Sequence, residues 1–166
     1  SIRAPLTGTF TRRHMQYSLK SQEALARRNN TPLALLLIDL DHFKTVNDQY
    51  GHLCGDMILR QVTDTIVAWA KRDIDMVFRY GGGEFLVMLP QTPLDGAAAL
   101  AERIRVSIDE KKFEMKCRED CIQVHCSVSI GVGVYEPASE DIMQCLARVD
   151  AKLYQAKKSG RNQVVC

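Results

Sequence analysis

Apolar residues along this chain change their spacing from segment to segment, and each spacing predicts an element. Residues 10–28 carry apolar side chains at helical intervals, which predicts a first helix. The continuous apolar run LALLLI at residues 33–38 is short and lies between Pro32 and Asp39. Such a run is typical of a central strand buried on both faces. Residues 56–69 return to the helical interval and predict a second helix.

The second half of the chain combines strands with longer helices. Two short apolar segments, residues 76–80 and 85–89, flank three consecutive glycines. This arrangement predicts a tight hairpin, because primed turns need positive φ angles that glycine adopts freely. The remaining predicted elements are a helix over residues 94–111 that begins after Pro93, one or two strands within 122–134, a helical region over 139–158 in two pieces ended by Gly160, and a short strand at 164–165.

A hairpin inside an otherwise alternating order of helices and strands predicts an α/β (α+β) fold, with a mixed or antiparallel sheet covered by helices. The 166 residues fit one globular domain that buries its own core. We therefore expect residues 1–166 to form a single domain. Because the sequence begins with Ser1 rather than Met, we expect this domain to be the C-terminal output part of a longer protein.

The composition is that of an ordinary soluble protein, with 46% apolar and 25% charged residues. The net charge of +2 gives no reason to expect a nucleic acid or an anionic membrane as a partner. No stretch approaches the ~20 apolar residues that cross a bilayer, and no signal peptide is visible. We expect a cytoplasmic domain without membrane contact of its own, either in a soluble protein or as the cytoplasmic part of a membrane-anchored one.

The chain has six cysteines, of which Cys117, Cys121 and Cys126 lie close together. Their spacing fits no standard zinc pattern. Reduced and packed thiols are expected in the cytosol. A disulfide or a metal site is the alternative.

Candidate chemistry gathers in residues 38–56, IDLDHFKTVNDQYGHLCGD. Asp39 and Asp41 lie two apart after the predicted strand, so in an extended chain they point to one side and offer two oxygen ligands to Mg²⁺. Helix capping or a turn is the alternative role for this pair. Asn47 and Asp56 provide the donors and acceptors that a guanine edge needs.

Other residues have both a functional and a structural interpretation. Lys44 is a cation placed to contact phosphate, whereas Gly51 and Gly55 bracket a tight loop that either binds a ligand or simply packs. Lys157 and Arg161 lie at the basic C-terminal end of the last predicted helix, where cations also stabilise the helix dipole.

Three segments together, DLDHFKTVNDQYGHLCGD, RYGGGEF and VDAKLYQAKKSGRNQV, resemble the GGDEF domain, the diguanylate cyclase of bacterial cyclic di-GMP signalling. The opening PLTGTFTRR is also similar, and the resemblance covers nearly the whole chain in order. It implies a central, mostly antiparallel sheet wrapped by helices, as in nucleotidyl cyclases and polymerase palms. It also implies that two domains meet as a homodimer, each holding one GTP, and that each 3′-hydroxyl attacks the α-phosphate of the other GTP. The products are cyclic di-GMP and pyrophosphate.

The resemblance implies roles for individual residues. Asp39 and the backbone carbonyl of Leu40 would bind Mg²⁺ or Mn²⁺, and Asp39, Glu84 and Lys44 would be the catalytic groups. The residues implied in GTP binding are Asn47 and Asp56 for guanine, and His42, Phe43, Lys44, Lys157 and Arg161 for the phosphates.

The glycines Gly81, Gly82 and Gly83 depart from the family pattern at the third position, where the family carries an Asp or Glu that bridges metal ions. Loss of even an outer group at a metal site costs roughly 10–100-fold, so we expect weak turnover. Glu84 should point to the opposite face of its strand, unless the extra glycine lets the turn twist and bring it round. A second departure is Ala4, where the family has an Asp that sets the junction with an upstream helix.

The sequence R-x-x-D at Arg72–Asp75 resembles the family's inhibitory site for cyclic di-GMP. An arginine forks to guanine O6 and N7, and an aspartate accepts from the N–H edge. A solvated ion pair is the alternative. Three functions are therefore weighed: a slow cyclase, an inactive receptor for GTP or cyclic di-GMP, and a scaffold without ligand. The retained base and phosphate residues argue against the scaffold, and Gly83 argues against rapid turnover.

Overall fold

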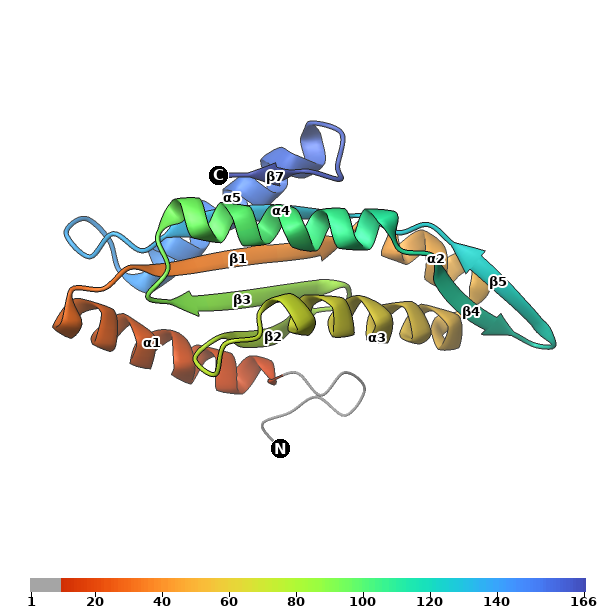
Figure 1. The fold of residues 1–166 in the computed structure, drawn as a ribbon, viewed down its shortest axis with the longest axis horizontal. Coiled ribbons are helices and arrows are strands. Elements are labelled where there is room, and N and C mark those ends of the chain that lie inside the picture. Colours follow the sequence, from red (N-terminus) through yellow and green to blue (C-terminus); the bar gives the residue numbers. More distant parts are fainter. Residues whose placement is uncertain (1–9) are drawn as a thin grey trace.

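The computed structural model describes residues 10–166, and Figure 1 shows a sheet covered by helices on both faces. Residues 1–9, including Ala4, lie outside the described part. The helices are α1 (Arg12–Asn29), α2 (Phe43–Tyr50), α3 (His52–Trp69), α4 (Leu94–Glu110) and α5 (Ile142–Lys158). The strands are β1 (Leu33–Leu40), β2 (Met76–Gly81), β3 (Glu84–Pro90), β4 (Phe113–Cys117), β5 (Asp120–Val124), β6 (Val128–Val134) and β7 (Val164–Val165).

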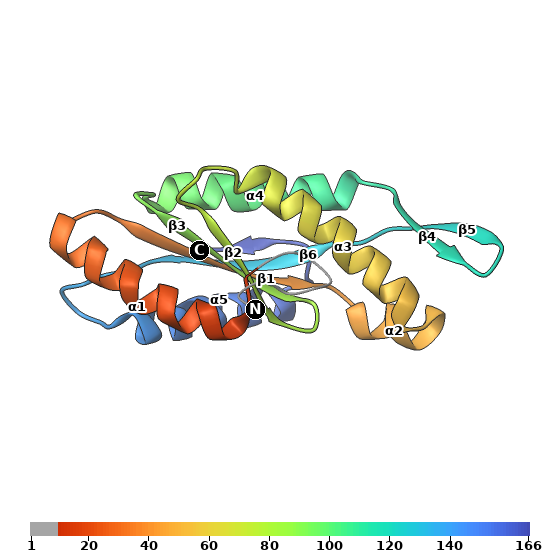
Figure 2. The same cartoon turned by 90° about the horizontal axis from the view of Figure 1, so that it is seen from below.

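The main sheet has the strand order β2-β3-β1-β6-β7. β1 is antiparallel to both of its neighbours, β3 and β6, whereas β6 and β7 are parallel, as is the isolated bridge between Phe10 and Phe78. β4 and β5 form a separate hairpin that projects from the body of the domain (Figures 1 and 2). The predicted mixed, mainly antiparallel sheet covered by helices is confirmed.

The central strand β1 divides the core into two layers. Leu36 and Ile38 belong to a cluster with residues of α3 and α4, whereas Leu35 and Leu37 belong to a cluster with residues of α1 and α5. Successive strand side chains point to opposite faces, so an unbroken apolar run satisfies both layers. The prediction of a strand buried on both faces is confirmed, because residues 33–38 are all buried.

Helix α2 was not predicted, since the segment FKTVNDQY has no fully buried residue and only a narrow apolar face. Gly51, with a φ of 88°, ends α2 and leads directly into α3. The expected loop between Gly51 and Gly55 is therefore wrong: Gly55 lies inside α3, which begins four residues before the predicted start.

The glycine hairpin differs from the predicted primed turn. Among the glycines of residues 10–166, only Gly51 and Gly160 have positive φ angles. The β2–β3 pairing instead shifts register between Arg79 and Gly81, and the Arg79 side chain donates to the carbonyl of Gly82 at 3.0 Å. A bulge thus replaces the left-handed turn that the sequence suggested.

Two further boundaries differ from the predictions. β4 was missed, although its alternating burial is visible once it pairs with β5. The predicted two-piece helix is the single helix α5, because Asp141 and Gln144 form a capping box that begins it at Ile142.

Cys54 of α3 and Cys117 of β4 form a disulfide with a Cα–Cα distance of 6.6 Å, so the expectation of reduced thiols is wrong for this pair. The other four cysteines are free. Burial raises the pKa of the Cys126 thiol to about 11 and that of Cys145 to about 12, which keeps both thiols protonated and unreactive.

Within residues 10–166, none of the helices combines the length and the apolar composition that a membrane span requires.

Candidate active site

A cavity of about 720 Å³ lies where β1 ends, and we call it the Asp39 pocket. Its walls come from the end of β1, the first turns of α2, the glycine hairpin and the C-terminal end of α5. The pocket brings together these predicted site residues: Asp39, Leu40, Asp41, His42, Phe43, Lys44, Asn47, Gly82, Gly83, Glu84, Lys157 and Arg161. Thr45, Asp48 and His52 also line it. The sequence does not single them out, because Thr45 and Asp48 lie in α2, which has no fully buried residue, and His52 is the first residue of α3.

Asp39 and Glu84 are direct partners in the antiparallel pairing of β1 with β3, so their side chains share one face of the sheet. Lys157 of α5 forms an ion pair with Asp39. Burial raises the pKa of the Asp39 carboxyl, and Lys157 opposes that rise. Burial also raises the pKa of Glu84, and the negative charge of Asp39 adds to the effect. Two carboxylates in a partly buried site therefore favour a nearby cation.

These donors fit a magnesium-like ion. Mg²⁺ in proteins is commonly held by one or two carboxylates together with substrate phosphates and water. Asp39 and Glu84 supply the carboxylates, and Leu40 lines the same pocket with its backbone carbonyl available as a further oxygen donor. Within residues 10–166 no cluster of three His, Cys, Asp or Glu side chains has the geometry of a metal site. The protein therefore offers a small set of ligands that a phosphate would complete.

Gly83 is buried, and its position explains what its missing side chain changes. A Cβ built there would lie 3.1 Å from the Phe43 ring and 3.3 Å from the Cβ of Leu40. The carbonyl of Gly83 accepts the N–H of Leu40 at 2.9 Å. Residue 83 therefore faces the α2 side of the pocket, while Glu84 shares the opposite face of the sheet with Asp39. Glu84 does not occupy the place that a carboxylate at position 83 would fill.

Asn47 of α2 presents a buried side-chain oxygen, Oδ1, that has no hydrogen-bond partner among the described residues. Buried polar atoms are rarely unpaired, and a ligand is one of the explanations. A Cβ on Gly55 would lie 1.8 Å from this oxygen, so glycine is required for α3 to approach Asn47 so closely. Asp56, the other predicted guanine residue, follows Gly55 but is absent from the pocket lining.

The α2 end of the pocket suits phosphate. His42 is the N-cap of α2 with a φ of 57°, and no side chain caps the helix. The first N–H groups of a helix and its dipole attract anions. Lys44 lies in this first turn, and Lys157 and Arg161 line the pocket from α5.

Asp41 has a different role from the one its spacing suggested. Its carboxylate accepts hydrogen bonds from Ser127 and Ser129, each at 2.7 Å, and from the backbone N–H of Asn162 at 3.1 Å. Both oxygens are therefore engaged within the protein. Asp41 does not join Asp39 as a second oxygen donor in this arrangement.

Arg72 and Asp75 form an ion pair at 2.7 Å, with the Asp75 side chain only 3% exposed. Arg72 also donates to the Pro90 carbonyl and to the Thr92 hydroxyl. The pair lines a separate cavity of about 480 Å³, which Trp69 and Arg103 also line. The two predicted residues are thus together, and the arginine is the more accessible of them.

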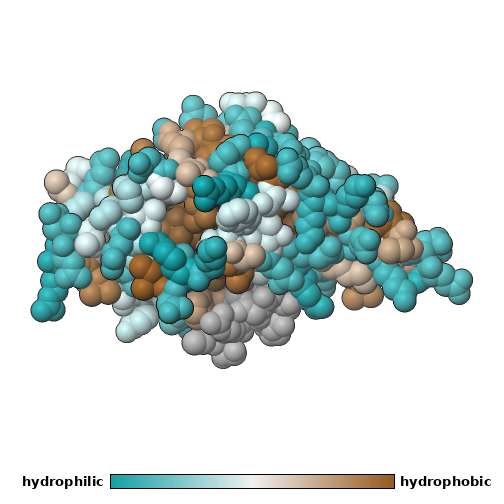
Figure 3. Space-filling model, in the orientation of Figure 1, coloured by the Kyte–Doolittle hydropathy of each residue, from teal (hydrophilic) through white to brown (hydrophobic). Residues whose placement is uncertain are grey.

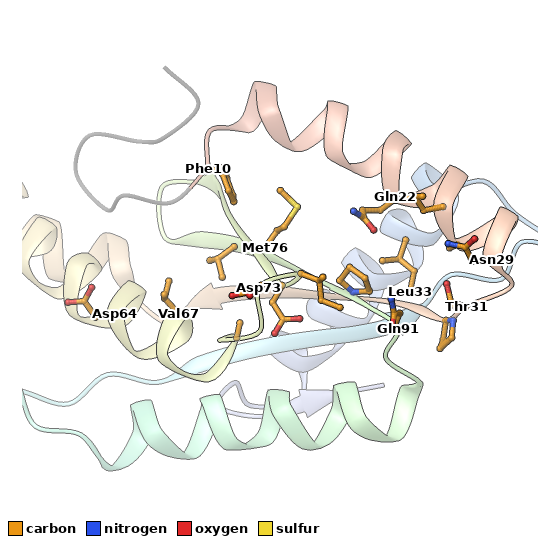
Figure 4. Close-up of a pocket in the computed structure, with 18 residues that line it drawn as sticks. Phe10, Gln22, Asn29, Thr31, Leu33, Asp64, Val67, Asp73, Met76 and Gln91 are labelled. Atoms are coloured by element: carbon orange, nitrogen blue, oxygen red, sulfur yellow. The ribbon is translucent and has the colours of Figure 1, made fainter.

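A further cavity of about 580 Å³ lies between α1, α3 and the edge strand β2 (Figure 4). Its lining combines apolar residues such as Leu25 and Val67 with Asp64 and Asp73, and no described residue of the lining is basic. In Figure 3, apolar patches lie among hydrophilic residues on the face of the domain shown in Figure 1. This cavity does not suit phosphate, whereas the Asp39 pocket does.

The sequence profile described as "Diguanylate cyclase, GGDEF domain" matches residues 2–163. Diguanylate cyclase A of Treponema denticola is 42% identical over 132 residues, which cover 80% of this chain and 34% of that protein. The response regulator PleD of Caulobacter vibrioides is 39% identical over 160 residues, which cover 96% of this chain and 35% of PleD. The chain thus spans about a third of the length of these relatives.

Solved structures show the same fold. The GGDEF domain of DgcB from Caulobacter crescentus, solved in complex with c-di-GMP, has a TM-score of 0.93 at 30% identity and covers 99% of this chain and 95% of its own. The active GGEEF domain of a diguanylate cyclase from Vibrio cholerae has a TM-score of 0.84 at 32% identity, covering 93% and 95%.

Proposed function

This chain belongs to the GGDEF family of diguanylate cyclases, which acts in cyclic di-GMP signalling, and we propose that it binds GTP in the Asp39 pocket but turns it over slowly. Members of this family are generally metal-dependent. The reaction that we propose for this chain joins two GTP molecules into cyclic di-GMP, with one GTP on each domain of a homodimer. Each 3′-hydroxyl attacks the other α-phosphate and releases pyrophosphate.

The pocket supplies separate contacts for the base and for the phosphates. The unpaired oxygen of Asn47 accepts an N–H of guanine, and Asp56 accepts a second one. The N-terminal turn of α2, with His42, Phe43 and Lys44, binds the terminal phosphates, and Lys157 and Arg161 contact them from α5. A buried acceptor matched to guanine disfavours adenine, which lacks the same N–H edge.

Asp39, the carbonyl of Leu40 and Glu84 would hold the divalent cation, Mg²⁺ or Mn²⁺. The cation, when bound, neutralises charge that develops on the transferred phosphate. Lys157 is paired with Asp39 in the present arrangement. GTP therefore draws the ammonium of Lys157 towards its own phosphates and leaves Asp39 to the cation.

The proposal of slow turnover depends on Gly83. The family carries a carboxylate here, and the active Vibrio cholerae relative has the sequence GGEEF. In this chain Gly83 has no side chain, and a Cβ at this position would lie against Phe43 and Leu40. Glu84 faces the other side of the sheet, so one carboxylate is absent from the α2 side of the site.

The test is cyclic di-GMP formation from GTP and Mg²⁺, measured by chromatography for the wild type, Gly83→Glu and Gly83→Ala. Gly83→Glu should increase the rate by about 10–100-fold or more, the range typical of lost metal-site groups. Gly83→Ala adds the same Cβ contact with Phe43 but no carboxylate, and should not increase it. Equal rates for the wild type and Gly83→Glu would contradict the proposal. GTP binding by all three proteins shows that the pocket is intact.

The alternative function is an inactive receptor for GTP or cyclic di-GMP. The cavity beside Arg72 favours it, because the half-exposed guanidinium of Arg72 lines this cavity together with Trp69 and Arg103. Calorimetric titration with cyclic di-GMP should show binding that Arg72→Ala abolishes, while GTP binding in the Asp39 pocket persists. Equal binding of cyclic di-GMP to both proteins would remove Arg72 from the site.

A further inference from the structure

The chain leaves α5 through three consecutive residues with positive φ angles. Gly160 has a φ of 110°, Arg161 of 62° and Asn162 of 45°. Glycine adopts such angles freely and asparagine tolerates them, but an arginine rarely does so. A conformation of this kind persists only where the surroundings hold it. Arg161 is also the residue that lines the Asp39 pocket from this turn.

The N–H of Arg161 donates to the carbonyl of Ala156 at 3.0 Å and closes the turn locally, whereas Asn162 supplies contacts that join the turn to the rest of the domain. Its backbone N–H donates to Oδ2 of Asp41 at 3.1 Å. Its side-chain Nδ2 donates to Oδ1 of Asp109 at 3.0 Å, and its Oδ1 accepts from Nη1 of Arg105 at 2.9 Å. One residue thus joins the turn to the end of β1 and to α4. Asn162 does not line the Asp39 pocket itself.

Asp41 is the second member of this arrangement. It is buried, and its two carboxylate oxygens accept from Ser127 and Ser129 of the β6 edge as well as from Asn162. Its own backbone N–H donates to the carbonyl of Ser127 at 2.9 Å. The same carboxylate therefore connects the end of β1, the start of β6 and the turn after α5.

These contacts join the two sides of the pocket. Asp39 precedes Asp41 by two residues, and Arg161 precedes Asn162 by one. We propose that Asp41 and Asn162 are positioning residues that hold the Arg161 turn against the end of β1, so that Arg161 meets the GTP phosphates beside Asp39. This inference rests on the proposed binding of GTP. Asn162 lies outside the Asp39 pocket. Asp41 lines the pocket, but both of its carboxylate oxygens are engaged by Ser127, Ser129 and the N–H of Asn162, so each residue acts through Arg161.

The test separates positioning from general stability by comparing GTP with guanosine, because only GTP presents phosphates to Arg161. Calorimetric titrations use the whole chain with Mg²⁺. Asn162→Ala should weaken GTP binding by about 10–100-fold, as outer groups of such sites do, and should leave guanosine binding unchanged. Asn162→Gly keeps the backbone N–H and adopts the positive φ freely, so it should lose less GTP affinity than Asn162→Ala does. Asp41→Asn should cause the same selective loss as Asn162→Ala.

The control is Asn30→Ala. Asn30 also has a positive φ, 51°, where it ends α1 before β1 begins, at the opposite end of that strand from the pocket. The Asn30→Ala variant should lower the melting temperature about as much as Asn162→Ala does, without changing the ratio of GTP affinity to guanosine affinity. A similar fall in that ratio for Asn30→Ala would overturn the inference, since stability alone would then account for the loss.

Arg161→Ala and its combination with Asn162→Ala complete the experiment. Because Asn162 acts through Arg161, the double variant should bind GTP no more weakly than Arg161→Ala alone. Additive losses would overturn the inference. If the wild type prefers GTP over guanosine and Asn162→Ala keeps that preference, the inference is overturned but the proposed function is not. A wild type without that preference overturns the proposed function and the inference together.

Discussion

Asp39 and Glu84 face each other across β1 and β3, and both carboxyl groups lose solvent there. Lys157 balances Asp39 through an ion pair. Burial therefore makes ionisation of these two carboxyl groups unfavourable, and a bound cation would offset that cost. Sites of this type commonly exchange stability for function.

The first prediction concerns pH. Burial raises the pKa of Glu84 above its ordinary value of 4.5, and the charge of Asp39 adds to the rise. The folded protein thus holds this proton more tightly than the unfolded chain, so ionisation of Glu84 costs stability as pH rises through the raised pKa. Glu84→Gln should melt above the wild type at pH 7. The difference should shrink as pH falls to 4.5 and below, where the carboxyl is protonated in both states.

Thermal melts of both proteins across this pH range, without metal, measure the effect. Glu119→Gln on the exposed β4–β5 hairpin is the control, and should melt like the wild type at every pH. A Glu84→Gln protein that melts below the wild type at pH 7 would show that the carboxylate is net stabilising.

The second prediction concerns Asn47. Replacement by leucine, which has nearly the same shape, removes a buried acceptor that has no partner within residues 10–166. Removing an unpaired buried polar atom is neutral or stabilising. Asn47→Leu should therefore melt at or above the wild-type temperature, yet bind GTP about tenfold more weakly or worse, since one hydrogen bond contributes roughly 0.5–1.5 kcal/mol and the leucine leaves guanine unpaired. Unchanged GTP affinity would show that Asn47 does not contact the base.

The third prediction concerns Gly55. The Cβ of Gly55→Ala would collide with Oδ1 of Asn47, so the asparagine must leave its place. GTP affinity should fall as it does for Asn47→Leu. Gly96→Ala is the control, because its Cβ would meet its nearest atom at 3.5 Å, an ordinary contact. Gly96→Ala in α4 should leave GTP affinity unchanged and should stabilise the protein by at most about 1 kcal/mol.

The fourth prediction concerns the packing of β6 on α5. A Cβ on Gly131 would lie 2.3 Å from the carbonyl oxygen of Val149 and 2.5 Å from the backbone nitrogen of Leu153. Backbone cannot move aside as a side chain can, so Gly131→Ala should cost about 3 kcal/mol of unfolding free energy. Gly82→Ala meets no atom within 4 Å and should cost far less. Denaturant unfolding of the two variants gives the comparison.

Much of the fold was predictable because the spacing of apolar residues along the chain matches the positions that are buried in the two layers of the core. The LALLLI run of β1 is apolar at every position that the two core clusters need. The segment of α2 gave no such signal, since it packs on the protein through one narrow side and leaves its polar residues to the pocket. The shape of the site consequently depends on a helix that periodicity alone does not reveal.

The site was predictable only in part. The family motifs place Asp39, Lys44 and Lys157 in one pocket. The role of Asp41 was missed, because its partners Ser127 and Ser129 lie far along the chain and only the β1–β6 pairing brings them near. The unusual φ of Arg161 is likewise invisible in the sequence, as arginine seldom adopts it.

Successive side chains of β1 point to opposite faces of the sheet, so the two walls of the pocket belong to different layers of the core. Asp39 belongs to the layer of α1 and α5, and Leu40 with the position of Gly83 belongs to the layer of α2 and α3. A substitution at one strand position therefore alters one wall and leaves the other wall intact. Nucleotide recognition and chemical turnover can thus drift apart in descendants of one ancestral domain, one strand residue at a time.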